Sequence, residues 1–141
     1  MQQLVGGLLM WAASLSHYPE PETPPNVLAV PHEQLEEILC GGQRCHAVAY
    51  YDHESASIFF DESLNLDDSI TAKSFVVHEM VHYLQHQAGK MTEMPMPCKE
   101  RIALEREAYI TQQKYLRQHH TLTYQVQTAL RLLGNICKTN E

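Results

Sequence analysis

The sequence is poor in positive charge, with 10 Lys and Arg against 17 Asp and Glu and a formal net charge of -7. Binding to the phosphates of nucleic acid needs a positive surface, and Lys and Arg do not cluster along this chain. We therefore do not expect nucleic acid to be the main binding partner. The chain also lacks an apolar run of the roughly 20 residues that cross a bilayer, so we expect no membrane span.

The first 16 residues, MQQLVGGLLMWAASLS, have an apolar centre that no Lys or Arg precedes. A secretory signal normally begins with such positive charge. Small residues nevertheless stand where a signal peptidase cuts. Two interpretations of residues 1–16 therefore stay open: they form a helix packed on the domain, or they are a residual targeting segment.

The four cysteines lack the close two-residue spacings typical of zinc ribbons. In CGGQRC two glycines let the chain fold back, so Cys40 and Cys45 are the natural local pair, and Cys98 and Cys137 then pair by elimination. Two disulfides indicate an oxidising compartment, and we expect a periplasmic or secreted protein. The alternatives are four reduced cysteines in a cytoplasmic protein, or a structural zinc site.

The length of 141 residues predicts a single domain, residues 1–141, with one core. Residues 17–26 contain four prolines and are expected to form an extended connection within it. The next segments predict a short strand in VLAV, a helix from Pro31 to a stop at Gly41, and a hairpin whose strands are AVAYY and SIFF.

Three further helices complete the expected α+β fold. Asp67 or Asp68 is expected to cap a helix that runs through SITAKSFVVHEMVHYLQHQAG to Gly89. A long helix spans about Cys98 to Gln118, and a last helix ends at Gly134.

The motif HEMVH, residues 78–82, lies inside the third predicted helix. Residues four apart share one helix face, so His78 and His82 can bind one zinc ion, each at about 2 Å. Glu79 projects roughly 100° from His78, beside the metal, where it can act as a general base. The flanks VV and YLQ are apolar, and burying the three polar side chains without a metal is unfavourable. We therefore expect one zinc ion here.

A catalytic zinc ion needs a third protein ligand. His86 lies about 12 Å from His78 along a straight helix, so a supporting or surface role is expected for it. Glu105 and Glu107 are two residues apart on a helix and point in different directions, so only one faces the site. The apolar residues nearer to Glu105 favour it as the ligand, with Glu107 solvated or bonded to a loop.

HEMVH on one helix, followed by E-x-x-A-Y on the next, resembles the gluzincin branch of the zincin metallopeptidases. The resemblance covers roughly residues 47–113 and is nearest to minimal, single-domain gluzincins. The pattern is also similar to that of small uncharacterised exported bacterial proteins, which join H-E-x-V-H-x-x-Q to E-x-E-A-Y with cysteines nearby. The metzincin pattern is excluded, because Gln85 and Ala88 stand where it has glycine and histidine.

The resemblance implies a minimal zincin-like fold, in which a small antiparallel sheet packs its edge strand on the HExxH helix. The strand in SASIFFDES is then the edge that binds extended peptides through its main chain, with Ser57, Ile58 and Phe59 as substrate-binding residues. Substrate selection is assigned to this strand and to the loop MTEMPMP, residues 91–97. Tyr109 stands where the family has Asp or Asn, and its hydroxyl is expected to orient a zinc-bound histidine or to stabilise an oxyanion.

Together these features predict a zinc-dependent metallopeptidase acting on peptide or protein substrates. His78, His82 and Glu105 hold the zinc ion, and Glu79 takes a proton from the attacking water. An amidase acting on cell-wall peptides is one alternative. A non-catalytic zinc-containing binding domain is the other, although a structural site has no use for a general base at Glu79. The sequence does not indicate the oligomeric state.

Overall fold

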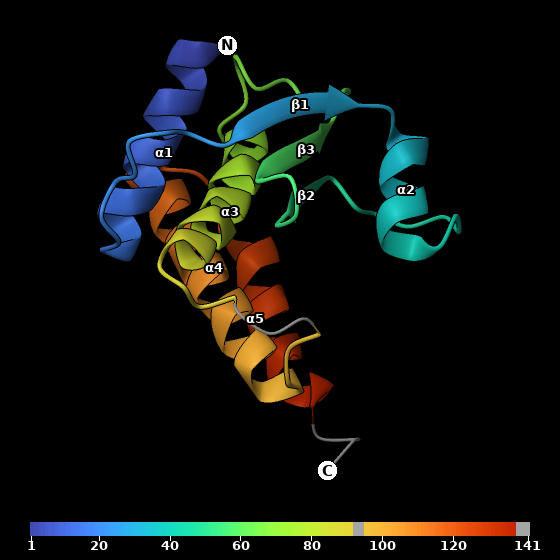
Figure 1. The fold of residues 1–141 in the computed structure, drawn as a ribbon. Coiled ribbons are helices and arrows are strands. Elements are labelled where there is room, and N and C mark those ends of the chain that lie inside the picture. Colours follow the sequence, from blue (N-terminus) through green and yellow to red (C-terminus); the bar gives the residue numbers. More distant parts are fainter. Residues whose placement is uncertain (92–94, 138–141) are drawn as a thin grey trace.

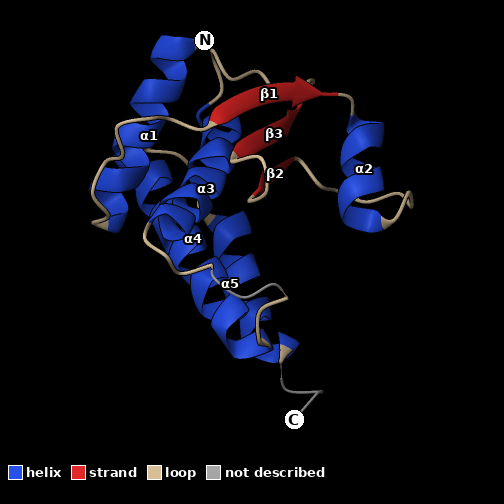
Figure 2. Ribbon diagram, viewed as in Figure 1, coloured by secondary structure: helices blue, strands red, loops and turns tan. Residues whose placement is uncertain are grey.

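The computed structural model describes residues 1–91 and 95–137. Helices and strands both occur in these ranges, and the α+β fold class is confirmed (Figure 2). In chain order the elements are α1 (Gln2–Ser16), β1 (Asn26–Val30), α2 (His32–Cys40), β2 (Ala49–Asp52), β3 (Ser57–Asp61), α3 (Ile70–Gln87), α4 (Cys98–Gln118) and α5 (Tyr124–Ile136).

The three strands form one mixed sheet in the order β1-β3-β2. β2 and β3 are the predicted hairpin, antiparallel with Tyr51 opposite Ile58, whereas β1 runs parallel to β3 with Leu28 opposite Phe59. The expectation of a wholly antiparallel sheet is therefore wrong for β1. The chain passes through α2 between β1 and the hairpin, and a crossover of this kind lets two strands run in the same direction.

The prediction that Ser57, Ile58 and Phe59 form a substrate-binding edge is wrong, because β3 is the central strand. Its main chain is paired with β1 on one side and with β2 on the other. The sequence pattern identifies a strand but not its neighbours, since strand order depends on where the crossover places β1. The strand at the edge of the sheet next to α3 is β2, whose Tyr51 amide donates to Glu79 of α3.

Helix α3 lies at the centre of the molecule, with α1, α4 and the strands β2 and β3 packed around it (Figure 1). Val76, Val77, Met80 and Val81 of α3 are each 0 % exposed. Burying one such side chain stabilises the fold by roughly 1.5–3 kcal/mol, so these residues fix the rotation of α3 about its axis. The polar residues of HEMVH are held at set positions as a consequence.

Helix α1 packs against α3 and α4 through Leu8, Leu9 and Ala12, all of them buried (Figure 1). The predicted helix over residues 1–16 is therefore confirmed, and it contributes to the main core. A targeting role for this segment stays a prediction.

Two predicted helix ends need correction. Ser69, rather than Asp67 or Asp68, caps α3, because its hydroxyl accepts a hydrogen bond from the Ala72 amide at 3.1 Å. Asp68 instead receives a hydrogen bond from the Asn65 side chain. The last helix continues past Gly134 to Ile136, where Cys137 follows and is tied to α4.

Both predicted disulfides are present, joining Cys40 to Cys45 and Cys98 to Cys137. The first closes the loop after α2, where Gly41 takes the left-handed conformation (φ 61°) that ends the helix as expected. The second fastens the far end of α5 to the start of α4.

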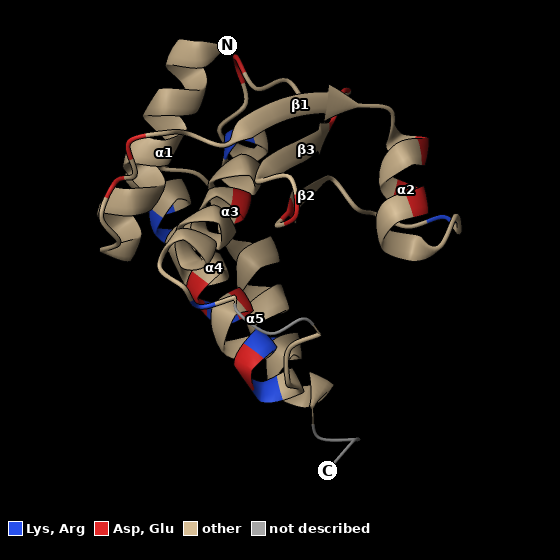
Figure 3. Ribbon diagram, viewed as in Figure 1, with Lys and Arg blue, Asp and Glu red and all other residues tan. Residues whose placement is uncertain are grey.

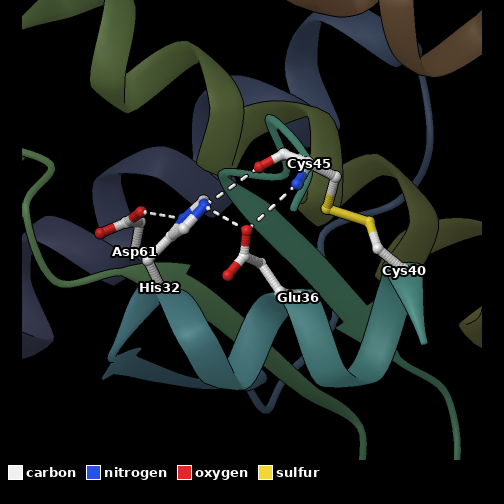
Figure 4. Close-up of a disulfide and its surroundings, with 5 residues drawn as sticks. All are labelled: His32, Glu36, Cys40, Cys45 and Asp61. Atoms are coloured by element: carbon white, nitrogen blue, oxygen red, sulfur yellow. Dashed lines mark hydrogen bonds and ion pairs between the residues drawn. A yellow bond between two sulfur atoms is a disulfide. The ribbon is translucent and has the colours of Figure 1, made fainter. Parts of the chain in front are cut away.

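Beside the first disulfide, His32 joins α2 to the end of β3 (Figure 4). Its Nδ1 lies 2.8 Å from Asp61 Oδ2, and its Nε2 lies 3.0 Å from the Cys45 carbonyl oxygen. Both partners only accept hydrogen bonds, so the ring can donate to both of them only when both nitrogens carry hydrogen and the ring is charged. The bond to Asp61 raises the pKa of His32 accordingly. Glu36 completes the group by accepting from the Cys45 amide at 3.1 Å.

Acidic and basic residues are interleaved on α4 rather than separated (Figure 3). This helix carries Glu100, Glu105 and Glu107 among its basic residues, which are Lys99, Arg101, Arg106, Lys114 and Arg117. In the described part of the chain, no helix combines the length and the apolar character that crossing a membrane requires.

Candidate metal centre

Three side chains from α3 and α4 converge on one point. His78 and His82 share a face of α3, and the Nε2 atoms of both rings approach Glu105 Oε1 of α4, at 3.0 Å and 2.7 Å. The potential ligand atoms of these three residues all lie within 4.8 Å of one another. The group can therefore hold a metal ion.

The packing of α4 on α3 distinguishes Glu105 from Glu107. Glu105 contacts both histidines, whereas Glu107 Oε1 accepts from Tyr18 at 2.5 Å and from Gln85 at 2.9 Å. Tyr18 belongs to the connection 17–26, so the expectation that Glu107 is bonded to a loop agrees with this contact. The role of Glu105 as a ligand stays a prediction, but its position is the expected one.

The orientation of His82 is set by Gln85, a fully buried residue one turn along α3. Gln85 Nε2 donates to the Leu104 carbonyl and to Glu107, both at 2.9 Å, so its Oε1 must face His82 Nδ1, also at 2.9 Å. An amide oxygen only accepts, so Nδ1 carries hydrogen. His82 Nε2 is thereby the nitrogen directed at Glu105.

His78 is held in the same way by Gln112 of α4. Gln112 Oε1 lies 3.0 Å from His78 Nδ1, and its Nε2 donates to Ser74 Oγ at 3.2 Å. Ser74 uses its own hydrogen on the Thr71 carbonyl, so it can only accept from Gln112. Both histidines therefore direct Nε2 inward, which is the arrangement that metal-binding histidines need.

Neither glutamine was given a role in the site from the sequence, although their spacing carries a signal. Gln112 follows Glu105 by seven residues, two turns on the same face of α4, and Gln85 follows His82 by three. Both are buried, at 4 % and 0 % exposed, and a buried amide needs hydrogen-bonding partners.

Glu79 lies beside the three-residue group without joining it. Its Oε1 accepts a hydrogen bond from the Tyr51 amide of β2 at 3.1 Å, and its Oε2 lies 4.0 Å from His78 Nε2. The edge strand thus holds one carboxylate oxygen of Glu79 and leaves the other turned toward the histidines. A general base in this motif requires that position.

The charges of the group are strongly coupled. Burial raises the pKa of Glu105, but hydrogen bonds from His78 and His82 outweigh it and hold that pKa well below its usual range. For His82, burial favours the neutral ring, whereas the bond to Glu105 and the charge of Glu79 raise its pKa to about 9. Without a metal ion, His82 is therefore protonated at neutral pH.

Tyr109 packs its ring against His78, with the ring centroids 4.4 Å apart at an angle of 62°. Since Gln112 accepts from His78 Nδ1, a role of Tyr109 in orienting that histidine finds no support in the contacts. Burial, together with the charges of Glu105 and Glu79, raises the pKa of Tyr109, so its hydroxyl stays protonated and able to donate. The second expectation, stabilising an oxyanion, stays a prediction.

His86 lies outside this group, because its Nδ1 is bonded to the Tyr51 hydroxyl at 2.7 Å. Its ring also lies against Tyr51 and His53. It supports the position of β2 on α3, in line with the supporting role expected from its spacing.

Two cavities have Glu79 in their walls. The larger, about 510 Å³, contains His78 and Tyr109 in its wall and is also lined by apolar residues of several elements, among them Phe75, Leu116, Val126 and Ala129. The smaller, about 350 Å³, contains His82, Glu105 and Tyr51 and is bordered by Met91, Pro95 and Met96. These last three belong to the loop 91–97 to which substrate selection was assigned, and its residues 92–94 lie outside the described residues.

A family model for a domain of unknown function, DUF6647, matches residues 1–141 of the chain. The chain belongs to the DUF6647 family. No curated protein and no solved structure matches it. The resemblance to gluzincins therefore rests on the motifs of the sequence and on the geometry described here.

The donor atoms of this DUF6647 domain fit a zinc ion. Two imidazole nitrogens and one carboxylate oxygen are a ligand set found at catalytic zinc sites, where a fourth position is left for water or substrate. Both Nε2 atoms face the same carboxylate oxygen, and both Nδ1 atoms are bonded to an amide oxygen. Among the described residues the group has three members, whereas a structural zinc site normally has four.

Proposed function

We propose that this protein is a zinc-dependent metallopeptidase, a hydrolase of the gluzincin type. The observation that carries the proposal is the convergence of His78, His82 and Glu105 on one point with Glu79 beside them but not among them. Three protein ligands leave the fourth coordination position of a zinc ion for water or substrate. The Glu79 carboxylate, which lies beside that position, can then act as a general base.

A zinc ion held by the three side chains would supply a Lewis acid that polarises the substrate carbonyl and lowers the pKa of a water. Glu79 accepts the proton of the attacking water and returns it to the leaving amine, as a general base and then a general acid. The Tyr51 amide keeps Glu79 in place during both transfers. The Tyr109 hydroxyl donates a hydrogen bond to the oxygen that gains negative charge in the transition state and keeps its proton.

The edge of β2 supports a peptide as the substrate. Val48 accepts from the Asp61 amide of β3, and since strand residues alternate, the main chain of Ala49 and Tyr51 points away from the sheet. The Tyr51 amide already does so, toward Glu79. An extended peptide can pair with this edge and extend its side chains into the two cavities that have Glu79 in their walls.

We also propose an oxidising compartment, periplasmic or extracellular, as the place of action. Two disulfides join residues of this small domain, and every cysteine is used in them. Such cross-links persist outside the reducing cytosol.

The substitution Glu79→Gln tests the enzymatic proposal. The glutamine keeps an oxygen for the Tyr51 amide but cannot take up a proton, so we expect full zinc content and a loss of turnover of about 10²–10⁴-fold. A panel of extended peptides, including cell-wall peptides, serves as substrates. Glu62→Gln, an exposed glutamate outside the site, is the matched control and should keep wild-type turnover.

If the wild-type protein binds zinc but cleaves nothing in the panel, the non-catalytic binding domain becomes the better interpretation. Turnover confined to cell-wall peptides favours the amidase instead. Turnover that survives in Glu79→Gln contradicts the role assigned to Glu79.

A further inference from the structure

Five polar side chains form a continuous chain of hydrogen bonds from the surface to His82. Lys90 Nζ donates to the Tyr18 hydroxyl at 2.7 Å, and that hydroxyl donates to Glu107 Oε1 at 2.5 Å. Gln85 Nε2 donates to the same oxygen of Glu107 at 2.9 Å, and Gln85 Oε1 faces His82 Nδ1 at 2.9 Å. This series of hydrogen bonds thus links the connection 17–26, α4 and α3.

This series of hydrogen bonds acts on His82 through the orientation of the Gln85 amide. A glutamine amide can turn by about 180° and exchange its oxygen and nitrogen, since the two ends have nearly the same shape. Turned over, its oxygen would face the Glu107 carboxylate and the Leu104 carbonyl, neither of which can donate. The nitrogen would then face His82 Nδ1, and the imidazole would lose its acceptor.

We propose that Glu107 is a positioning residue of the metal centre, which acts through Gln85 to keep His82 Nε2 directed at the metal position. Tyr18 and Lys90 hold the Glu107 carboxylate in turn. The inference rests on the proposed function only in taking His82 as a metal ligand. It gives the two glutamates of EREAY separate duties, with Glu105 in the metal site and Glu107 behind His82.

A purely structural role for Glu107 predicts a different result. The Tyr18 to Glu107 bond also joins the connection 17–26 to α4, and loss of that tie alone would lower the stability of the whole domain. Metal affinity measured on the folded protein would then stay unchanged. The two roles therefore separate on affinity rather than on thermal stability.

The test measures zinc affinity of the full chain by competition with a chelator at one fixed pH, and the visible spectrum of the Co²⁺-loaded protein. For Glu107→Ala we expect zinc affinity to fall by about 10–100-fold, the range for loss of a residue that supports a metal ligand, and the Co²⁺ bands to shift. Glu107→Gln keeps an oxygen for both donors and should stay within about threefold of wild type. Glu100→Ala, an exposed glutamate of α4, is the matched control.

The path through Gln85 is tested by combining substitutions. In a Gln85→Ala background, Glu107→Ala should cause no further loss, because the two residues act on His82 in series. The thermal midpoint of each metal-free variant shows whether it is folded. If Glu107→Ala does not fold, Tyr18→Phe replaces it, with a several-fold loss of affinity expected that disappears in the Gln85→Ala background.

Wild-type affinity and spectrum in a folded Glu107→Ala variant would overturn the proposal, as would losses that add fully in the double variant. Neither measurement depends on turnover. A protein that binds zinc as described but cleaves no peptide therefore contradicts the peptidase proposal alone, and unchanged affinity in an active Glu107→Ala variant contradicts the positioning role alone.

Discussion

Gln112 Oε1 lies 3.0 Å from His78 Nδ1, so the partner of this histidine is seven residues beyond Glu105 on α4. The resemblance to gluzincins placed the corresponding partner at Tyr109, which instead lies against the ring of His78. One helix face thus presents Glu105 to Nε2 and Gln112 to Nδ1 of the same ring. The partner of this first histidine is thus an amide from a different position of α4 than the one that Tyr109 occupies.

Loss of this amide should weaken metal binding. For Gln112→Leu, which keeps the side-chain size and removes both hydrogen bonds, we expect zinc affinity to fall by about 10–100-fold. Its neighbour Gln113→Leu serves as the control and should bind zinc as the wild type does. Competition with a chelator measures both, and equal affinities in the two variants would show that His78 needs no fixed orientation.

Metal affinity should depend on pH through His82. Because its pKa is raised to about 9 in the metal-free protein, zinc must displace a proton from the ring at any lower pH. We expect apparent affinity to fall by about tenfold for each pH unit below 9, and more steeply where other ligands also protonate. Calorimetry in buffers of different ionisation enthalpy counts the protons released, and a count of zero at pH 7 would contradict this linkage.

The bridge between His32 and Asp61 should stabilise the fold in a limited pH window. The pKa of His32 is raised from 6.5 in the folded protein. Its contribution to the stability of the fold is therefore complete below pH 6.5 and is lost as the pH rises through the pKa that His32 has in the folded protein. Burial raises the pKa of Asp61, but bonds from Ser63 and His32 lower it below 3.8, so its contribution is lost only in stronger acid. The bridge is therefore strongest between about pH 4 and 6.5.

Thermal midpoints measured across this range test the bridge. His32→Asn should lower the midpoint most near pH 5 and least above pH 8. His120→Asn replaces an exposed histidine at the end of α4 and should give a curve parallel to that of the wild type. If the two variants show the same pH dependence, the bridge does not contribute as stated.

The larger cavity should select large uncharged side chains of the substrate. Ala129 of α5 lies in its wall, and Ala129→Trp places a large ring in the space. We expect kcat/KM to fall at least about tenfold for peptides with Phe or Leu next to the cleaved bond, and to change little for those with Ala or Gly. Gln127→Trp, at an exposed position of α5, is the control, and equal losses on both kinds of peptide would contradict the assignment.

Much of the local structure could be predicted from the sequence. The hairpin, the long helix Cys98–Gln118 and both disulfides follow from turn residues, apolar spacing and the short CGGQRC loop. The shared face of His78 and His82 follows from four-residue spacing on any helix. Ser69 was missed as the cap of α3 because three adjacent polar residues can cap a helix, and the neighbouring turn decides between them.

Strand order and the partners of the site depended on contacts between distant segments. The edge next to α3 is β2 and not β3, because the crossover through α2 brings β1 to the other side of β3. Gln85 ends the H-E-x-V-H-x-x-Q pattern and Gln112 lies two turns beyond Glu105, but their role as hydrogen-bond partners of the histidines appears only when each amide is placed against an imidazole.

The sequence by itself determined that His78 and His82 share one helix face with Glu79 beside them, because spacing within one helix fixes which side chains lie together. Apolar neighbours on α4 already favoured Glu105, but only the tertiary structure decided that its carboxylate meets both histidines and that Glu107 lies behind His82. Two glutamates on one helix both present a carboxylate, and the choice between them depends on how α4 packs against α3. That packing is set by apolar side chains buried across the whole core, so a local pattern can favour Glu105 but cannot place it against the histidines.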